Sequence, residues 1–259
     1  MAKLVINENK TEGHINPEIY GHFSEHLGRC IYEGLYVKED SGIPNVNGMR
    51  TDVVEALREM QIPVLRWPGG NFAGEFNWMD GLLPADMRAP FQSYLGLETQ
   101  PHTMGYDFSE MNTDDFIALC REIGAEPFIT INPCWNTPDE NAAWVEYCNG
   151  DVSTPYGKLR ANRGHQEPYN VQFWSLGNEF GYGHMEGDNT PAGYCQIALE
   201  NGKKMLEASP GLSLCSSGPY PNKEWAEFSA ACRDFSDDFP ALLWLRPPLH
   251  RPFHRRGGI

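Results

Sequence analysis

The sequence Val171-Gln172-Phe173-Trp174-Ser175-Leu176-Gly177-Asn178-Glu179 joins a short apolar run to a polar turn. The run has the length and aromatic content of a buried β-strand, and it stops at a glycine. The turn then ends in a carboxylate directly beside an amide. Strands that deliver polar side chains at their carboxyl ends are typical of α/β proteins, which build their sites at that edge of a parallel sheet.

Similar strands recur on both sides of this stretch, and helix-like segments separate them. The other candidate strands lie near Glu18–Phe23 and at Ile62–Trp67, Pro127–Asn132 and Leu212–Ser216. The predicted helices cover about residues 51–60, 114–123, 138–149, 191–208 and 222–233. This alternation predicts βαβ units and a parallel sheet.

Several of the helices have recognisable start and stop signals. Thr113 is expected to cap one helix that Gly124 closes, with acidic residues in its first turn. Thr137-Pro138 and Thr190-Pro191 each place a capping residue before a proline at the first helical position.

Two arrangements of the sheet are open, a doubly wound sheet and a (β/α)8 barrel. No G-x-G-x-x-G or Walker-type loop follows a strand, which weakens the nucleotide-binding doubly wound arrangement. Polar residues follow several strands: Glu25 and His26, Arg66, Asn132, Asn178 and Glu179. Because barrels build their active sites at this rim, the barrel is favoured. A long loop from Asn71 to about Tyr106 is predicted to be functional.

Composition excludes several classes of protein. The chain has 259 residues, of which 41% are hydrophobic and 21% charged, as in an ordinary soluble protein. Its net charge of -15 disfavours nucleic acid and anionic membranes and suits a neutral substrate. No apolar run reaches the roughly 20 residues of a membrane span, and the start turns polar too early for a signal peptide. We therefore expect a cytoplasmic protein.

Two residue types add detail. The seven cysteines are scattered without a C-x-x-C pair, which indicates free thiols in a reducing compartment. Aromatic residues make up 12% of the chain, and many lie beside Gly, Pro and Asn. Core packing explains most aromatic residues, but those in polar loops also suit sugar rings.

The strongest chemical signal is Leu176-Gly177-Asn178-Glu179. A carboxyl group on a barrel rim can be kept protonated in a partly desolvated pocket and can then donate to a leaving oxygen. Glycoside hydrolysis needs such an acid, because the departing sugar oxygen leaves poorly until it is protonated. The amide of Asn178 can donate to and accept from a sugar hydroxyl. The alternative is a Gly-Asn turn with a solvated Glu179.

A second motif is Arg66-Trp67-Pro68-Gly69-Gly70-Asn71-Phe72. The Pro-Gly-Gly turn brings the backbone close to whatever lies above the rim. Arg66 can form paired hydrogen bonds with a carboxylate, and Asn71 can reach a sugar hydroxyl. The alternative is a structural turn with an Arg in an ion pair.

A third motif is Gly21-His22-Phe23-Ser24-Glu25-His26-Leu27-Gly28-Arg29. Glu25 lies near the end of the first strand, where a carboxylate can accept hydrogen bonds from two vicinal hydroxyls. His22 and His26 are four residues apart, a spacing that brings two ligands together on a helix. Since this segment reads as strand and loop, no metal site is expected.

Together, the order and spacing of these three motifs resemble glycoside hydrolase family 51, the intracellular α-L-arabinofuranosidases. The stretch Trp144-Val145-Glu146-Tyr147-Cys148-Asn149 also resembles that family, and the resemblance covers about residues 3–235. It implies a (β/α)8 barrel and a β-sandwich. Residues 1–14 would add a strand to the sandwich, which the chain otherwise lacks, and residues 15–240 would form about five βα units of an incomplete barrel.

The resemblance also implies a function. It is the retaining hydrolysis of terminal non-reducing α-L-arabinofuranosyl residues in arabinan, arabinoxylan or their oligosaccharides. It implies no metal or organic cofactor, no nucleic-acid or membrane partner, and homo-oligomers for full-length members.

By motif match, Glu179 would be the general acid/base, and Glu25, Arg66, Asn71 and Asn178 would bind the arabinose. A retaining mechanism needs a second carboxylate about 5–5.5 Å from the first. The family's nucleophile is a Glu at the end of the seventh strand, and no residue here matches it. The chain alone is therefore expected to be inactive.

The last residues differ from the rest. Residues 241–259 are rich in Arg and Pro, and no acid follows Asp238. Prolines at this density exclude a central strand or a helix interior, so a disordered tail is predicted. We favour a reading-frame change near residue 240 over a genuine basic tail, and an intact frame through residue 259 would exclude it.

Two other functions stay open. One is another retaining barrel hydrolase of the xylanase or β-glycosidase type, which the Arg66–Asn71 motif speaks against. The other is a non-catalytic carbohydrate-binding fragment, for which half a barrel is a poor scaffold.

Overall fold

The centre of the fold is a parallel β-sheet. In this computed structural model, the described residues are 3–4, 9, 13–88, 90–92, 106–107, 109–180, 190–217 and 242–243. Within them the sheet has six strands, in the order β1 (His22–Phe23), β4 (Val64–Trp67), β7 (Glu126–Thr130), β8 (Phe173–Leu176), β9 (Ser213–Ser216) and β10 (Leu242–Leu243). Every neighbouring pair is parallel. The prediction of an α/β fold with a parallel sheet is confirmed.

The order of the strands in the sheet follows their order in the chain. A doubly wound sheet reverses its order at a switch point. No reversal occurs among the six described strands, so the doubly wound arrangement is excluded for this part of the chain. The sheet is wound in the manner of a barrel wall.

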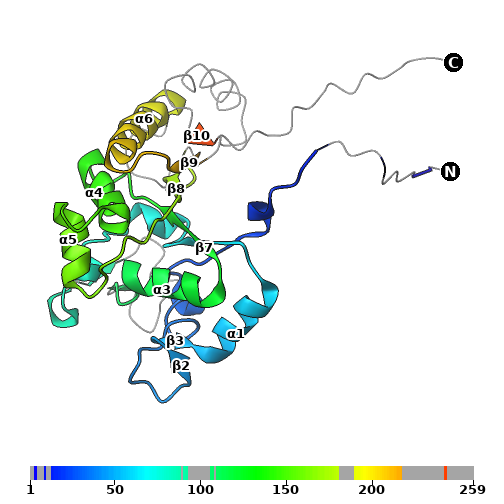
Figure 1. Ribbon diagram of the computed structural model, residues 1–259, viewed down its shortest axis with the longest axis vertical. Helices are drawn as coiled ribbons and strands as arrows, with labels where there is room; N and C mark the ends of the chain where they lie inside the picture. Colours follow the sequence, from blue (N-terminus) through cyan, green and yellow to red (C-terminus); the bar gives the residue numbers. More distant parts are fainter. Residues whose placement is uncertain are drawn as a thin grey trace.

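Helices connect successive strands. They are α1 (Thr51–Met60), α3 (Thr113–Ile123), α4 (Pro138–Asn149), α5 (Pro155–Asn162) and α6 (Pro191–Ala208). Helix α1 contacts α3, and α4 contacts both α5 and α6, so the helices follow one another around the sheet (Figure 1). Two small antiparallel pairs lie outside the main sheet: β2 (Asn45–Val46) with β3 (Met49–Arg50), and β5 (Phe91–Gln92) with β6 (Tyr106–Asp107).

One row of side chains across the sheet is fully buried. Trp67, Ile129, Trp174 and Leu214 are paired in register on successive strands, and each is 0% exposed. Trp144 of α4 packs edge-on against Trp67 and Trp174. Side chains alternate along a strand, so the residues between those of this row face the opposite side of the sheet.

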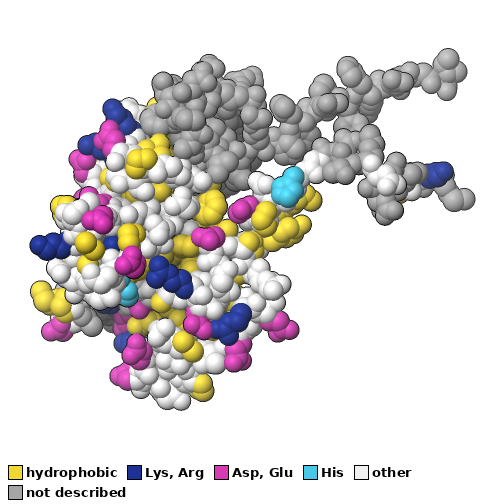
Figure 2. All heavy atoms as spheres, viewed as in Figure 1, with side chains coloured by type: hydrophobic (Ala, Val, Ile, Leu, Met, Phe, Trp, Pro, Cys, Tyr) yellow, Lys and Arg dark blue, Asp and Glu magenta, His cyan; other side chains and the backbone are white. Residues whose placement is uncertain are grey.

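Core packing also accounts for most of the described tryptophans that the sequence places near loops. Trp78 is fully buried and stacks on Trp144, with ring centroids 6.0 Å apart. Trp135, in the loop after β7, is the exception at 64% exposed. Figure 2 shows that charged and hydrophobic side chains are interspersed on the visible described surface.

The start signals of several helices are confirmed. Helix α1 begins and ends at the predicted residues. Thr137 caps α4 in a capping box with Glu140, and Thr190 caps α6 by accepting the N–H of Gly193. Gly124 closes α3 with a φ of 78°.

The cap of α3 was assigned to the wrong residue. Asn112, not Thr113, accepts the N–H groups of Asp114 and Asp115, and the Asp115 carboxylate accepts the N–H of Asn112. Thr113 is the first helical residue, and its hydroxyl accepts the indole N–H of Trp144 at 3.1 Å. A shared side-chain preference for caps could not separate two adjacent candidates.

Helix α5 was missed. It carries the same Thr-Pro start signal as α4 and α6, with Thr154 accepting the N–H of Gly157. The helix has only 8 residues and contains a glycine, so its helical pattern in the sequence is weak.

Two predicted segments, a strand and a long loop, contain 3-10 turns in the structure. Only β1 survives of the strand expected near Glu18–Phe23, because Pro17–Tyr20 form a 3-10 turn. The expected long loop contains further 3-10 turns, at Asn71–Gly74, Asp80–Leu82 and Ala85–Met87. Another 3-10 turn covers Gly28–Cys30.

Some predictions fall outside the described residues. They are the helix at 222–233, most of the strand Leu4–Ile6, and the tail at 241–259 apart from β10. The proposed boundaries at residues 14 and 240 stay predictions. Within the described part of the chain, no helix combines the length and apolar character that crossing a membrane requires.

A buried carboxylate joins three helical segments. Asp114 of α3 accepts hydrogen bonds from the hydroxyls of Tyr147 and Tyr169, at 2.6 and 2.8 Å, and from Nε of Arg163 at 3.0 Å. Burial, followed by the charge of Asp114, raises the pKa of both tyrosines. The two hydroxyls and Nε of Arg163 thus share one acceptor, while Nη of Arg163 also donates to the Leu82 carbonyl at 2.6 Å.

We expect Asp114→Ala to lower the free energy of unfolding by about 3–5 kcal/mol, because it leaves two buried hydroxyls and the half-buried Arg163 without this acceptor. Asp52→Ala is the control, since its ion pair with Arg50 lies on the surface, and its effect should be much smaller. Urea unfolding measures both, and equal losses would contradict the role of Asp114.

Candidate active site

The polar residues that follow the strands converge at the carboxyl edge of the sheet. Glu25 follows β1, Arg66 lies in β4, and Asn71 comes after β4. Asn178 and Glu179 follow β8. Parallel strands end at the same edge, so residues far apart in the sequence meet there.

The Glu25 carboxylate is held by main-chain amides. Its Oε1 accepts the N–H of Gly70 at 2.9 Å and the N–H of Phe72 at 3.0 Å. Gly69 has a φ of +155°, and a Cβ there would lie 2.4 Å from Cγ of Glu25. The Pro-Gly-Gly turn is therefore needed for the close approach of this carboxylate to the backbone.

Arg66 connects three parts of the edge. One Nη atom donates to Oδ1 of Asn178 at 2.6 Å and to the Gly69 carbonyl at 3.1 Å. Its Nε donates to the Thr130 hydroxyl at 2.8 Å. The sequence suggested paired hydrogen bonds to a carboxylate, but the described acceptors are an amide, a carbonyl and a hydroxyl.

Two carboxylates nevertheless lie near enough to Arg66 to affect its pKa. Burial lowers the pKa of its guanidinium, and the nearby carboxylates of Glu25 and Glu179 raise it. The guanidinium also lies over the Phe23 ring, 5.4 Å from its centroid. The site thus places the charges of Glu25 and Glu179 near one half-buried cation, whose hydrogen bonds go to Asn178, Gly69 and Thr130.

The Asn178 side-chain amide forms a hydrogen bond at both its oxygen and its nitrogen. Its oxygen accepts from Arg66, and its Nδ2 donates to Oδ1 of Asn71 at 3.4 Å. Asn178 is 7% exposed. The structure therefore brings Glu25, Arg66, Asn71 and Asn178 into one connected group.

Glu179 lies next to this group, on a turn that is fixed from beneath. Its φ is +47°, which is uncommon for a residue with a side chain. Phe180 is fully buried against the Tyr194 ring, with centroids 4.7 Å apart. The Tyr194 hydroxyl donates to the Leu176 carbonyl at 3.1 Å and accepts the N–H of Ser217 at 2.7 Å.

The side chain of Glu179 is exposed. The partly desolvated pocket that the sequence suggested is therefore not formed by the described residues around it. A Cβ at Gly177 would lie 3.0 Å from Cγ of Pro133, so the loop after β7 packs against the same turn.

His26 has a structural role. It is 1% exposed, its Nε2 accepts the Trp67 indole N–H at 3.0 Å, and it stacks on Phe72 with centroids 4.5 Å apart. His22 is exposed, so the two histidines do not face a common centre. In the described ranges, no three His, Cys, Asp or Glu side chains form a group that could hold a metal ion.

Asn132 is also structural. Its Oδ1 accepts the N–H groups of Cys134 and Trp135, both at 3.1 Å, and its Nδ2 donates to the Phe76 carbonyl. The supporting roles of Thr130 and Tyr194 were missed from the sequence. Thr130 ends β7, so its place beside the polar edge was the one available signal, whereas Tyr194 inside α6 gave none.

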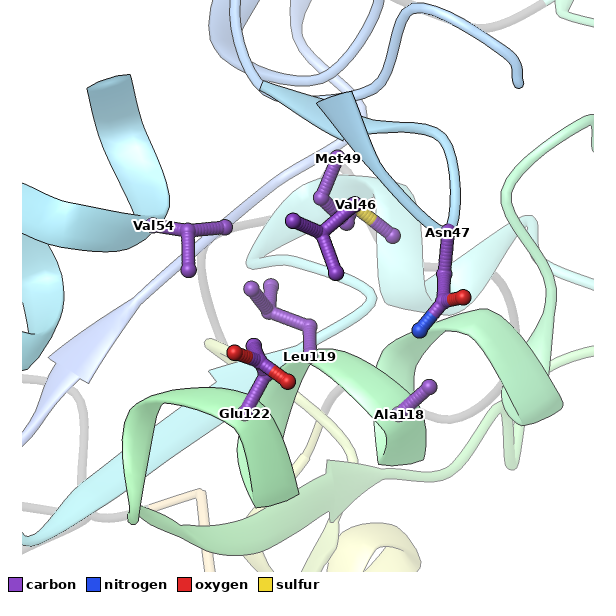
Figure 3. A pocket seen from close by; sticks show the side chains of 7 residues that line it. All are labelled: Val46, Asn47, Met49, Val54, Ala118, Leu119 and Glu122. Atoms are coloured by element: carbon purple, nitrogen blue, oxygen red, sulfur yellow. The ribbon is translucent and has the colours of Figure 1, made fainter. Parts of the chain in front are cut away.

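A surface hollow with almost no enclosed volume lies away from this edge (Figure 3). It is lined mainly by apolar residues of α1, α3 and the β2–β3 pair, with Glu122 at its margin. Glu122 forms an ion pair with Arg58. The hollow lacks a converging set of polar groups and is not the candidate site.

The winding of the sheet and the position of the polar group define a class of protein. It is an α/β protein of barrel type with a carboxylate-containing site at the carboxyl ends of its strands. Comparison with known proteins narrows this class. The family model described as "Alpha-L-arabinofuranosidase 1 domain" matches residues 56–227.

Curated relatives support the same family assignment. The chain is 42% identical over 253 residues to alpha-L-arabinofuranosidase C of Emericella nidulans, covering 96% of this chain and 45% of the relative. It is 40% identical over 179 residues to the intracellular exo-alpha-L-arabinofuranosidase of Bacteroides ovatus, covering 69% of this chain and 34% of the relative. The chain thus spans less than half the length of these relatives.

Solved structures agree as well. The alpha-L-arabinofuranosidase from Thermotoga maritima, in an arabinose complex, is 44% identical with a TM-score of 0.69, over 76% of this chain and 39% of that one. The family 51 arabinofuranosidase from Xanthomonas axonopodis is 27% identical with a TM-score of 0.75, over 85% and 45% of the two chains. This chain belongs to glycoside hydrolase family 51, the α-L-arabinofuranosidases, as the motifs indicated.

We expect Gly69→Ala to lower the free energy of unfolding by about 1–3 kcal/mol more than Gly164→Ala, because only the former forces a methyl group into Glu25. Gly164 is a matched control with a φ of +102° and no atom within 4 Å of an added Cβ. Both variants carry backbone strain at a positive φ. The difference between their free energies of unfolding, measured by chemical denaturation, therefore reports the contact between residue 69 and Glu25. Equal losses would show that Glu25 does not pack on Gly69.

Proposed function

We propose that this chain supplies the arabinose-binding subsite and the general acid/base of a retaining α-L-arabinofuranosidase. The substrates would be terminal non-reducing α-L-arabinofuranosyl residues of arabinan, arabinoxylan or their oligosaccharides. The observation that carries this proposal is the connected group of Glu25, Arg66, Asn71 and Asn178 directly beside Glu179.

The connected group has the donors and acceptors that a sugar requires. Glu25 uses Oε1 for two main-chain N–H groups, so Oε2 is available to accept from sugar hydroxyls. The amides of Asn71 and Asn178 can each donate and accept. Held by Arg66 and the Pro-Gly-Gly turn, these groups need little reordering when a sugar binds.

Glu179 would protonate the glycosidic oxygen as it leaves and would later remove a proton from the attacking water. Its exposed position suits a bond that joins the bound arabinose to a polymer outside the site. A bound substrate would itself displace water from this carboxyl group.

The second carboxylate of a retaining mechanism would come from a later strand of a closed (β/α)8 barrel. In support, the relatives are more than twice as long as the part of them that this chain matches. Glu25, the other carboxylate near Arg66, is anchored by two N–H groups and suits binding rather than attack. We therefore propose that the 259-residue chain lacks the nucleophile.

Other expected properties accompany this proposal. They are a strand from residues 1–14 in a β-sandwich, a barrel portion at residues 15–240, a cytoplasmic location and a homo-oligomeric full-length protein. No observation on the described residues favours the xylanase or β-glycosidase function. A carbohydrate-binding fragment without catalysis is the other outcome of the tests below.

Binding can be tested on the chain itself with methyl α-L-arabinofuranoside as the ligand. Arg66→Lys should weaken its affinity about tenfold or more, because a lysine cannot orient Asn178 and the Gly69 carbonyl at once. Arg58→Lys, on the surface of α1, is the control and should bind normally. Titration calorimetry measures both, and equal affinities for the two variants would contradict the assigned subsite.

Catalysis can be tested in a fusion that supplies the rest of the barrel. Residues 1–217 of this chain fused to the remaining barrel and sandwich of the Emericella nidulans relative should hydrolyse p-nitrophenyl α-L-arabinofuranoside, whereas the 259-residue chain should not. In the fusion, Glu179→Gln should slow arabino-oligosaccharide hydrolysis by about 10²–10⁴-fold. For the 2,4-dinitrophenyl glycoside, kcat/KM should fall far less, because kcat/KM reports the first step and that leaving group needs no proton.

The matched control for that experiment is Glu167→Gln, an exposed carboxylate before β8 at the opposite edge of the sheet. It should leave both rates unchanged. An equal fall in kcat/KM for both substrates in Glu179→Gln would rule out the acid/base role.

A further inference from the structure

Thr130 is the last residue of β7, and its side chain is fully buried. Arg66 is paired in register with Phe128, two residues earlier on the same strand. Side chains two residues apart in a strand point to the same face, so Thr130 lies on the face of Arg66, one step closer to the carboxyl edge. This places a hydroxyl beside the guanidinium.

The hydroxyl accepts a hydrogen bond from Nε of Arg66 at 2.8 Å. The same guanidinium donates through Nη to Asn178 and to the Gly69 carbonyl. A guanidinium is planar and rigid, so acceptors at Nε and at Nη together fix its plane. Thr130 thus holds one end of the group whose other end orients the Asn178 amide.

The Thr130 hydroxyl that accepts from Arg66 is uncharged, and this affects the electrostatics of the site. The carboxylates of Glu25 and Glu179 both act on the Arg66 charge. A third carboxylate at residue 130 would compete with them for that charge. A hydroxyl fixes the direction of the guanidinium and leaves its charge to the site.

We infer that Thr130 is a positioning residue of the arabinofuranosyl subsite, which fixes Arg66 and, through it, the sugar-facing amide of Asn178. This inference rests on the proposed function, because it assigns Asn178 to sugar binding. Thr130 acts through Arg66 and needs no contact with the sugar.

The test removes the hydroxyl and keeps the shape. Thr130→Val in the 259-residue chain should weaken the binding of methyl α-L-arabinofuranoside about tenfold, the equivalent of one buried hydrogen bond to a charged group. Thr130→Ser should restore most of the affinity. If the valine variant does not fold, Thr130→Ser and Thr130→Ala form a second pair that differs only in the hydroxyl.

A matched control separates positioning from stability. Thr113 is also fully buried, and its hydroxyl also accepts an N–H from a side chain, that of Trp144, within α3 and α4. Thr113→Val should lower the free energy of unfolding as Thr130→Val does, and it should leave the affinity unchanged.

A spectroscopic readout follows the hydrogen bond itself. The Nε–H resonance of Arg66, assigned by its loss in Arg66→Lys, should exchange slowly with water in the unchanged chain and in Thr130→Ser. In Thr130→Val it should shift and exchange faster, and in Thr113→Val it should not change.

Three results would count against the inference. The first is that Thr130→Val binds the sugar as well as the unchanged chain, and the second is that Thr113→Val weakens binding as much as Thr130→Val. Either result would overturn the positioning role of Thr130 and leave the proposed function standing. If the unchanged chain does not bind the sugar at all, the proposed function fails, and the role of Thr130 fails with it.

Discussion

Arg66 brings a positive charge into the carboxyl edge of the sheet, where burial lowers the pKa of its guanidinium and the carboxylates of Glu25 and Glu179 raise it. A half-buried cation loses part of its hydration, and hydrogen bonds from its N–H groups replace some of it. Here they reach a hydroxyl on β7, a carbonyl in the turn after β4 and an amide after β8. The need to satisfy this one group therefore sets the relative positions of three strand ends.

The second constraint is the absence of a Cβ at Gly69 in the Pro-Gly-Gly turn. Glu25 can reach the N–H of Gly70 only because Gly69 has no Cβ, which would otherwise lie 2.4 Å from the Glu25 side chain. Beneath the turn, His26 stacks on Phe72 and accepts from Trp67. In this motif, polar groups at the edge of the sheet therefore lie above a layer of packed aromatic rings.

Much of the fold could be predicted from local signals. Helix α1 matches its predicted ends, and the Thr-Pro starts of α4 and α6 are found as expected, because caps and prolines act over a few residues. The same locality explains the errors. Asn112 and Thr113 are both good caps, and α5 is too short to show a pattern.

The motifs indicated which residues would lie together at the candidate site, but not the contacts between them; the functional roles of these residues stay predictions. The motifs identified Glu25, Arg66, Asn71, Asn178 and Glu179. The partner of Arg66 was expected to be a carboxylate, whereas it is the amide of Asn178, 112 residues away. Such a pairing depends on the strand register, which single motifs do not encode. The same holds for Thr130 and Tyr194, whose importance comes from what they touch.

The most direct measurement is a crystal structure of this chain with methyl α-L-arabinofuranoside. The account predicts that the sugar hydroxyls contact Glu25 and Asn178 and that the Glu179 carboxyl group hydrogen-bonds the glycosidic oxygen. A sugar bound elsewhere, or one whose glycosidic oxygen points away from Glu179, would contradict it.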